Sequence, residues 1–331
     1  MNATTIPSNG SNASNATGAN VPGTDALLCV EDLQVRLPGL PPDQPILDGV
    51  SLTLQAGRTL GIVGESGSGK SMTALAIMGL LPEGARAGGR ILLQGRELLA
   101  LPEREMQTLR GNRVAMVFQE PMTALNPVHT IGNQVAEPLR LHQGLGRRAA
   151  MAEACHLLER VGIANAAQRL SAYPHQFSGG QRQRITIAMA LACKPDLLIA
   201  DEPTTALDVI LQQQILDLLD GLVEEHRMGM ILISHDLAVV SEYSDDVAVM
   251  LRGSVVERGA TQAVFARPQH AYTRQLLAAR LHMLEPHVPS AEEQAQERDA
   301  AAGAAAAAVW EAEQGARAVE PGPDVDVEGQ P

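Results

Sequence analysis

A glycine-rich loop between a short apolar run and an alanine-rich segment constrains this chain more than any other feature. The stretch 61-GIVGESGSGKSMTALAIMGLL-81 has the pattern of a strand, a loop and a helix in immediate succession. Glycines allow a tight turn whose N–H groups point inward, and the N-terminus of the following helix adds positive potential. The sequence therefore predicts a layered α/β domain that binds polyphosphate at this loop.

The two residues that directly follow Gly69 carry the side chains expected to bind phosphate and metal. Lys70 would reach the β- and γ-phosphates of a nucleotide, and the hydroxyl of Ser71 would ligate Mg²⁺. A glycine-rich turn that only preceded a core helix would not explain this Lys-Ser pair. The residues predicted to bind nucleotide here are Gly64, Glu65, Ser66, Gly67, Ser68, Gly69, Lys70 and Ser71.

Short aliphatic runs alternate with helical patterns over about residues 25–265, the order expected of an α/β domain. The predicted strands are 59–63, 114–118, 197–200, 230–234 and 247–251. From about residue 120 to 194 helical patterns dominate, as in 149-AAMAEACHLLERVG-162, where apolar residues recur every three or four positions. The sequence therefore predicts one α/β core with an inserted helical subdomain.

Acidic and polar residues at the ends of the predicted strands are candidates for catalysis. In 197-LLIADEP-203, Asp201 would hold Mg²⁺ and Glu202 would accept a proton from the attacking water. These acids could instead cap a helix, but Lys70 favours the catalytic interpretation. Gln119, after 114-VAMVF-118, could contact both Mg²⁺ and the water, and His235, after 230-MILIS-234, could reach the γ-phosphate. The predicted catalytic residues are Glu202, His235 and Gln119, and the predicted metal ligands are Ser71, Gln119 and Asp201.

These motifs, together with 178-SGGQ-181 and 206-ALD-208, resemble the ATP-binding subunits of ABC transporters over roughly residues 27–282. The matching motifs are Walker A (64–71), the Q-loop (Gln119), the signature (178–181), Walker B (197–202), the D-loop (206–208) and the switch histidine (His235). The resemblance implies a P-loop NTPase (RecA-like) core of the ABC ATPase type, ATP hydrolysis, and ATP and Mg²⁺ as cofactors.

The resemblance also implies that two such domains pair head to tail. The signature loop and the helix N-terminus behind it would then contact the γ-phosphate of ATP held by the partner's Walker A motif. On this basis Ser178, Gly179, Gly180, Gln181 and Asp208 are expected to contact nucleotide.

Two further stretches, 119-QEPMTALNPVHTIGNQ-134 and 268-PQHAYTRQLL-277, look like those of peptide and nickel importers. The expected function is that of an ATP-hydrolysing importer subunit that energises uptake of di- or oligopeptides or a related small substrate through partner membrane subunits. A nickel or metal-chelate importer, an exporter and a non-transport ABC ATPase are the alternatives. The expected partners are two membrane-spanning permease subunits, a second identical or paralogous ATPase domain and, indirectly, an external substrate-binding protein. The expected location is the cytoplasmic face of the membrane.

Charge and composition place further limits on the chain. Of the net charge of −13, residues 285–331 contribute 11 acids and two arginines, so the remainder is only mildly acidic and no nucleic-acid partner is expected. Residues 1–22 and 291–331 are expected to be disordered, and residues 266–290 to form an importer-like C-terminal segment. Cys29, Cys155 and Cys193 are expected to be buried thiols, and no iron–sulfur centre is expected because no cysteine follows Cys193.

The nucleotide base poses a separate question, because residues 27–62 contain no Phe, Tyr or Trp. The expected adenine-binding surface is aliphatic or prolyl, with residues 37–42 as its source. An aromatic stack contributes about 1 kcal/mol beyond its buried area, so discrimination between bases is expected to be weak.

Overall fold

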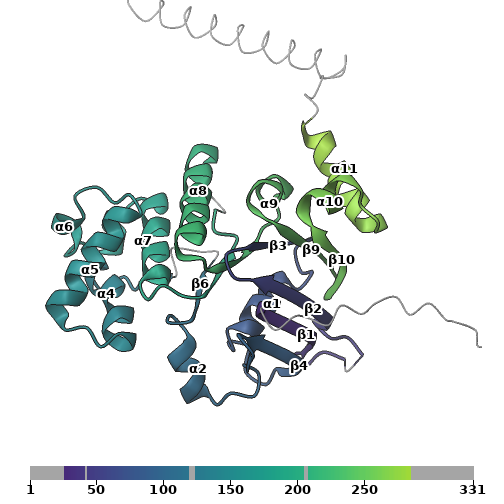
Figure 1. Ribbon diagram of the computed structural model, residues 1–331, viewed down its shortest axis with the longest axis horizontal. Helices are drawn as coiled ribbons and strands as arrows, with labels where there is room; N and C mark the ends of the chain where they lie inside the picture. The colour runs from purple at the N-terminus through teal and green to yellow at the C-terminus, as the bar shows by residue number, and fades with distance from the viewer. Residues whose placement is uncertain (1–25, 42, 119–123, 205–207, 285–331) are drawn as a thin grey trace, which may run out of the picture. The chain divides into compact units, whose positions relative to one another are not determined.

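The computed structural model describes residues 26–41, 43–118, 124–204 and 208–284 of the 331-residue chain (Figure 1). The two tails, 1–22 and 291–331, lie outside the described residues. Gln119 and residues 206–207 of the predicted D-loop lie outside them as well, so the expectations for these residues stay predictions.

The described strands and helices follow one another in an α/β order. The strands are β1 (Ala26–Arg36), β2 (Leu47–Gln55), β3 (Thr59–Val63), β4 (Arg86–Leu93), β5 (Arg96–Glu97), β6 (Val114–Val117), β7 (Leu197–Asp201), β8 (Gly229–Ile233), β9 (Asp246–Leu251) and β10 (Ser254–Ala260). The helices are α1 (Lys70–Ile77), α2 (Glu103–Leu109), α4 (Ile131–His142), α5 (Arg147–Arg160), α6 (Ala166–Arg169), the 3₁₀ helix η1 (Pro174–Gln176), α7 (Gly179–Leu191), α8 (Val209–His226), α9 (Leu237–Tyr243), α10 (Thr261–Ala266) and α11 (Ala271–Leu284).

A six-stranded sheet in the order β10-β9-β3-β8-β7-β6 forms the centre of the core. All of its neighbouring strands are parallel except β10, which pairs antiparallel with β9. The five predicted strands are members of this sheet, and their positions are confirmed to within one or two residues. Strands β6 and β7 are direct neighbours, Val114 opposite Leu197, although the helical subdomain separates them in sequence. The helical subdomain is therefore an insertion between two adjacent strands.

The central strands are apolar throughout because both faces of the sheet are covered. Every residue of β7 and β8 is buried. Successive side chains of a strand point to opposite faces, and Leu198, Ala200, Met230 and Leu232 belong to the cluster under the helical subdomain. Their neighbours along the two strands belong to the cluster on the other face. This two-sided burial explains the near-continuous hydrophobic runs.

A second, antiparallel sheet in the order β2-β1-β4-β5 covers the other face. The sequence reasoning did not predict it. The pairing of β1 with β2 carries register shifts at residues 30–33 and 33–35, which interrupt the alternation that marks a strand. The first five residues of β4 are exposed and include Gly88 and Gly89, which are unfavourable in strands. The pattern was therefore too irregular to be recognised.

The inserted subdomain is helical, as predicted. Helices α4, α5, α6 and α7 form a group beside β6 and α8 (Figure 1). Its interior includes Leu139, Leu158 and Ile185, each fully buried. The predicted helix at 149–162 is α5, and Gly162 follows its end with a φ of 83°. Of the cysteines, Cys29 and Cys193 are buried, but Cys155 on α5 is only partly buried, which corrects the expectation for that residue.

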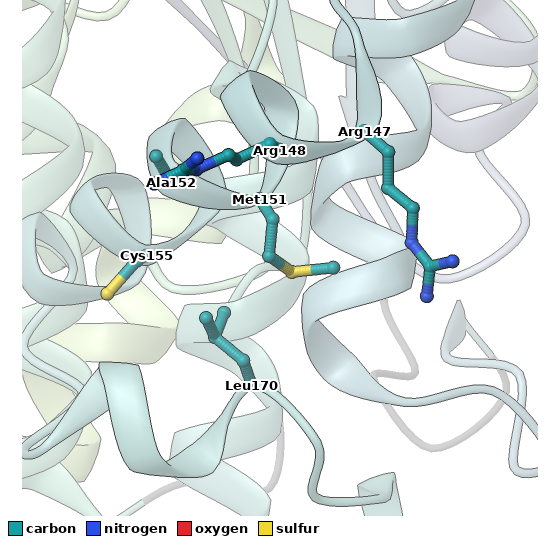
Figure 2. Close-up of a pocket in the computed structure, with 6 residues that line it drawn as sticks. All are labelled: Arg147, Arg148, Met151, Ala152, Cys155 and Leu170. Carbon is teal, nitrogen blue, oxygen red and sulfur yellow. The ribbon is translucent and has the colours of Figure 1, made fainter.

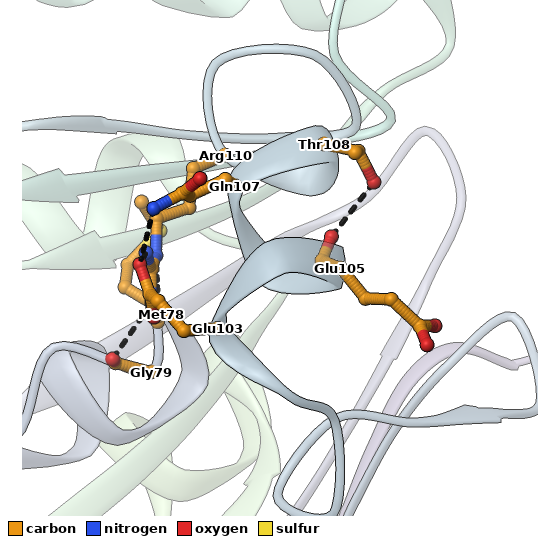
Figure 3. A network of polar contacts seen from close by, with 7 residues as sticks. All are labelled: Met78, Gly79, Glu103, Glu105, Gln107, Thr108 and Arg110. Atoms are coloured by element: carbon orange, nitrogen blue, oxygen red, sulfur yellow. Dashed lines mark hydrogen bonds and ion pairs between the residues drawn. The ribbon is translucent and has the colours of Figure 1, made fainter.

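Arg110 fixes the C-terminal end of α1, the helix that follows the glycine-rich loop. Its guanidinium donates to the carbonyls of Met78 at 2.7 Å and Gly79 at 2.8 Å, and it pairs with Glu103 of α2 at 2.6 Å (Figure 3). Cations are favourable at a helix C-terminus because they meet unpaired carbonyls. This contact ties α1 to α2 and holds the helix in place behind the loop.

The chain after β9 packs onto the same body. Val264 of α10 and Tyr272 of α11 are buried in a cluster with Val63, Leu237 and strand β9. Residues up to Ala278 belong to one compact unit. The beginning of the importer-like C-terminal segment is therefore attached directly to the core.

Gly61 in the middle of β3 is a site where the fold requires the absence of a side chain. A Cβ there would lie 2.4 Å from Cγ1 of Val240 and 2.7 Å from Oγ of Ser244. We expect Gly61→Ala to force α9 away from the sheet and to lower the free energy of unfolding by about 1–3 kcal/mol. Thermal and urea unfolding measure this change.

The matched control is Gly221→Ala in α8, where a Cβ meets nothing within 4 Å. Because alanine favours a helix interior over glycine, this variant should gain about 0.5–1 kcal/mol. Equal melting temperatures for the two variants would contradict the close packing of α9 on β3.

Candidate functional site

The glycine-rich loop, Asp201, Glu202 and His235 meet at the carboxyl edge of the parallel strands. The glycine-rich loop follows β3, Asp201 ends β7, and His235 lies two residues after the end of β8. Strands β3, β8 and β7 are neighbours in the sheet. In parallel α/β sheets this edge is where ligands bind, because the loops from several strands converge there.

The glycine-rich loop has a backbone that only glycine adopts readily. Gly64, Gly67 and Gly69 have φ values of 151°, 77° and 104°. A Cβ on Gly64 would also lie 2.2 Å from the carbonyl oxygen of Met250 in β9. The glycines therefore serve both the curvature of the loop and its close approach to the neighbouring strand.

Lys70 is the first residue of α1, and its side chain turns back into the loop. It is 6% exposed, and its Nζ donates to the carbonyl oxygens of Gly64 at 2.7 Å and Glu65 at 2.9 Å. Burial lowers the pKa of Lys70, and the carboxylates of Glu202 and Asp201 act in the opposite direction. The ammonium thus lies under the loop, beside two acids.

The loop is joined to the end of β7 by one hydrogen bond. The hydroxyl of Ser71 donates to Oδ1 of Asp201 at 3.2 Å. Asp201 is 5% exposed, and burial raises its pKa, while the bond from Ser71 and the charge of Lys70 oppose that rise. Two of the three predicted protein ligands of Mg²⁺, Ser71 and Asp201, are therefore direct neighbours, although 130 residues separate them.

Glu202 and His235 form a second contact at the same edge. Their side chains approach to 3.3 Å between Oε2 and Nδ1, with the Glu202 side chain 17% and the His235 side chain 67% exposed. Glu202 has a φ of 48°, which is uncommon for a residue with a side chain. Its N–H donates to the carbonyl of Ile233 in β8 at 2.9 Å. The backbone is thus locally strained where the predicted catalytic base lies.

These residues fit a magnesium nucleotide. The loop offers N–H groups, an open position at Gly67 where a Cβ meets nothing within 4 Å, and the buried Lys70 ammonium. Ser71 and Asp201 offer the oxygen ligands that Mg²⁺ prefers. The contacts of these residues with nucleotide and metal stay predictions, and Gln119, the third predicted metal ligand, lies outside the described residues.

The predicted signature residues lie elsewhere, at the start of α7. Ser178 is the N-cap, with its hydroxyl accepting from the N–H of Gln181 and the Gln181 side chain accepting from the N–H of Ser178. This reciprocal capping fixes the helix N-terminus. Within the described parts of the chain, no hydrogen bond or ion pair joins residues 178–181 to residues 64–71.

The two signature glycines have different surroundings. Gly179 is exposed, and a Cβ there meets nothing within 4 Å. Gly180 is buried, and a Cβ there would lie 2.2 Å from Cδ2 of Leu211 in α8. Asp208 caps α8 by accepting from the N–H of Leu211 at 2.9 Å. Gly180 and Asp208 therefore have structural roles in this chain in addition to the predicted contacts with nucleotide.

Sequence reasoning missed a side chain from the C-terminal segment that contacts the loop. The hydroxyl of Tyr272 in α11 accepts a hydrogen bond from the N–H of Glu65 at 3.0 Å. Tyr272 belongs to the stretch 268–277, which was singled out only for its resemblance to importers. Nothing in its spacing indicated a contact 207 residues away.

A cavity of about 550 Å³ lies on the helical subdomain, away from these residues. Its walls come from α5 and from Leu170 beside α6, and Figure 2 shows Met151 and Leu170 close together while Arg147 points away from them. It contains none of the predicted site residues and is not part of the candidate nucleotide site.

Comparisons with known proteins agree with this geometry. Residues 47–205 match the model of the family described as ABC transporter. The chain is 51% identical over 266 residues to the peptidoglycan transport ATP-binding protein YejF of Agrobacterium fabrum, covering 80% of this chain but only about half (49%) of that relative. It is 50% identical to the oligopeptide transport ATP-binding protein OppD of Salmonella typhimurium, with 77% of this chain and 76% of OppD covered.

A solved structure has the same fold. The dimeric ATP-binding cassette MJ0796, in a post-hydrolysis state bound to ADP and Pi, superposes with a TM-score of 0.63 at 26% identity. The match covers 71% of this chain and 98% of that cassette. The chain belongs to the ABC transporter family and carries that family's ATP-binding domain.

Proposed function

We propose that this protein is the ATP-hydrolysing subunit of an ABC importer that takes up di- or oligopeptides or related small peptides. The observation that carries the proposal is the hydrogen bond between Ser71 and Asp201, because it joins the glycine-rich loop to the acidic strand end beside Glu202 and His235. A fold that used the loop only as a turn would have no reason to gather these four groups at one edge of the sheet.

In this proposal each residue at the edge has a distinct task. Lys70 exchanges the carbonyls of Gly64 and Glu65 for the β- and γ-phosphates of ATP. Ser71 and Asp201 hold Mg²⁺, which supplies positive charge against the phosphate oxygens. Glu202 orients the attacking water and accepts its proton, while His235 contacts the γ-phosphate and steadies the Glu202 carboxylate. Gln119 contacts Mg²⁺ and the attacking water in this proposal.

The second ATPase domain is proposed from the exposure of the signature loop. Ser178 and Gly179 are exposed at a capped helix N-terminus, an arrangement that suits an anion, and they have no bond to the chain's own glycine-rich loop. We infer that they contact ATP bound by a second copy or a paralogous chain. The MJ0796 cassette, which is a dimer bound to ADP and Pi, supports this arrangement.

The transported substrate and the permease partners are proposed from the relatives. These relatives are named as oligopeptide and peptidoglycan transport proteins, which favours peptides over nickel as the substrate. No helix among the described residues is long and apolar enough to cross a bilayer. We propose that two separate permease subunits supply the membrane path, with this chain bound at the cytoplasmic face of the membrane.

The role of Glu202 is tested by Glu202→Gln. The amide keeps the size of the side chain but cannot accept the proton of the attacking water. We therefore expect ATP binding within about threefold of wild type and steady-state hydrolysis at least a hundredfold slower, a loss of about 2.7 kcal/mol or more in transition-state stabilisation. Nucleotide titration and a phosphate-release assay measure the two effects.

The matched control for Glu202 is Glu242→Gln on the exposed side of α9, a few residues after His235. It removes the same charge from an exposed position near the start of β3, at the other end of the strands from Glu202, and it should leave hydrolysis unchanged. If Glu202→Gln hydrolysed ATP at the wild-type rate, Glu202 would not be the catalytic base.

The signature loop is tested by Gly179→Asp. The open space at Gly179 means that the fold tolerates the side chain, whereas the added carboxylate would repel the γ-phosphate of the partner's ATP. We expect each monomer to bind one ATP with near wild-type affinity while hydrolysis is lost. Lys70→Ala should instead weaken binding itself. If the chain pairs with itself, mixing the two variants should restore part of the activity in the mixed dimers.

Gly146→Asp is the matched control, since Gly146 is the N-cap of α5 in the same subdomain and a Cβ there also meets nothing within 4 Å. Aspartate is favourable at an N-cap, so stability and hydrolysis should be retained. Loss of ATP binding by isolated Gly179→Asp monomers would mean that the signature loop contacts the chain's own nucleotide.

A further inference from the structure

The stretch 268-PQHAYTRQLL-277 has no role in the proposed function, yet the structure brings it to the glycine-rich loop. Tyr272 is the second residue of α11 and is 8% exposed. Its hydroxyl accepts a hydrogen bond from the backbone N–H of Glu65 at 3.0 Å. A side chain from the end of the compact unit thus contacts the second residue of the Walker A motif.

The contact completes a two-sided hold on a single peptide group. The carbonyl of Gly64 and the N–H of Glu65 belong to the same peptide plane, and in a trans peptide they point in opposite directions. The carbonyl accepts from Nζ of Lys70 at 2.7 Å, and the N–H donates to Tyr272 at 3.0 Å. Lys70 therefore holds one edge of the plane and Tyr272 holds the other.

This peptide group needs such a hold because glycine precedes it. Gly64 has a φ of 151°, and without a Cβ its backbone has more accessible conformations than that of any other residue. Rotation of the Gly64–Glu65 plane would turn the carbonyl away from Lys70 and move the N–H groups of the residues that follow. The orientation of the plane thus decides whether the loop presents its donors to a phosphate.

Tyr272 is itself held rigidly. The carboxylate of Glu257 in β10 accepts from the N–H groups of Gln269 at 2.7 Å and His270 at 3.0 Å, which fixes the residues that lead into α11. Nδ1 of His270 then accepts from the N–H of Tyr272 at 3.2 Å. The aromatic ring packs in the cluster that contains Val63, the last residue of β3. The hydroxyl is therefore positioned by the same sheet that carries the loop.

We propose that Tyr272 is a positioning residue of the nucleotide site, which holds the Gly64–Glu65 peptide in the orientation that the loop needs to bind phosphate. Tyr272 acts through the backbone of Glu65 and does not touch the nucleotide. The inference rests on the proposed function, since ATP is the ligand whose binding it supports. It also gives the C-terminal segment a task in this chain, namely to keep the Walker A loop in its binding conformation.

The test is Tyr272→Phe, which keeps the packed ring and removes only the hydroxyl. We expect the Kd of Mg-ATP to rise threefold to tenfold, which corresponds to about 0.7–1.4 kcal/mol, the contribution of one hydrogen bond. The kcat at saturating ATP should stay within about twofold, and the melting temperature within about 4 °C. In the nucleotide-free full-length protein, the amide hydrogen of Glu65 should exchange about tenfold faster than in wild type.

The matched control is Tyr243→Phe in α9, whose hydroxyl donates to Asp217 at 2.7 Å, away from the loop. The same chemical change there should leave the Kd of Mg-ATP and the exchange of Glu65 unchanged. A purely structural role for Tyr272 would lower its melting temperature and leave the Kd of Mg-ATP equal to that of the control.

Three results would overturn the inference: an unchanged Kd in Tyr272→Phe, an equal rise in the control, or a Glu65 amide that exchanges in wild type as fast as an unstructured peptide. The last measurement needs no variant, so it decides the matter even if Tyr272→Phe folds poorly. Failure of the wild-type protein to bind Mg-ATP would instead refute the proposed function. A protected Glu65 amide would then still show that the contact exists, which separates the two outcomes.

Discussion

Burial of both faces of the parallel sheet is the constraint on which the rest of the molecule depends. Strands β7 and β8 are covered on one side by the helical subdomain and on the other by the antiparallel sheet, so their side chains are apolar up to Asp201, the last residue of β7. Polar chemistry is therefore confined to the strand ends. Asp201 is the only acidic residue of β7 and its last residue, and its side chain is buried at the edge of the core. Burial raises the pKa of Asp201 and lowers that of Lys70, because it disfavours the charged form of each side chain. The opposite charge of the other side chain favours both charged forms.

The glycine-rich loop must be tightly curved and must also keep a single conformation. Its glycines permit the curvature at Gly64, Gly67 and Gly69 but supply no side chains to hold it. The loop is held by Lys70, which bonds to its carbonyls, by Ser71 through Asp201, and by two groups from later in the chain, the Tyr272 hydroxyl and the N–H of Gly253. In nucleotide-free protein Lys70 is occupied with carbonyls of the loop itself. In the proposed function, a phosphate of ATP would replace these carbonyls as the partner of the ammonium, and the contacts of Tyr272 and Asp201 would keep the loop in its shape.

The sequence predicts those features that leave a pattern within one short segment of the chain. The five parallel strands, the helical insertion and the gathering of Lys70, Ser71, Asp201, Glu202 and His235 were predictable, because buried strands read as apolar runs and the ends of parallel strands share an edge. The antiparallel sheet was not, since register shifts in β1 and glycines in β4 broke the alternation. The bond from Glu65 to Tyr272 was not predictable either, because no local pattern relates two residues 207 positions apart. The exposure of Cys155 depends likewise on tertiary packing.

The signature loop, residues 178–181, is well structured but lies apart from the chain's own candidate nucleotide site. Ser178 and Gln181 cap α7 so well that the helix N-terminus is fixed with no ligand, and Gly180 is locked against Leu211 of α8. Gly179 alone has open space in front of it, at an exposed N-terminus with positive potential. The rigid surroundings of this glycine and the rigid surroundings of the Walker A loop belong to separate clusters of the core, and each presents donors to solvent. In the proposed dimer, ATP held between two chains would meet the N–H donors of one chain's Walker A loop and of the other chain's signature loop.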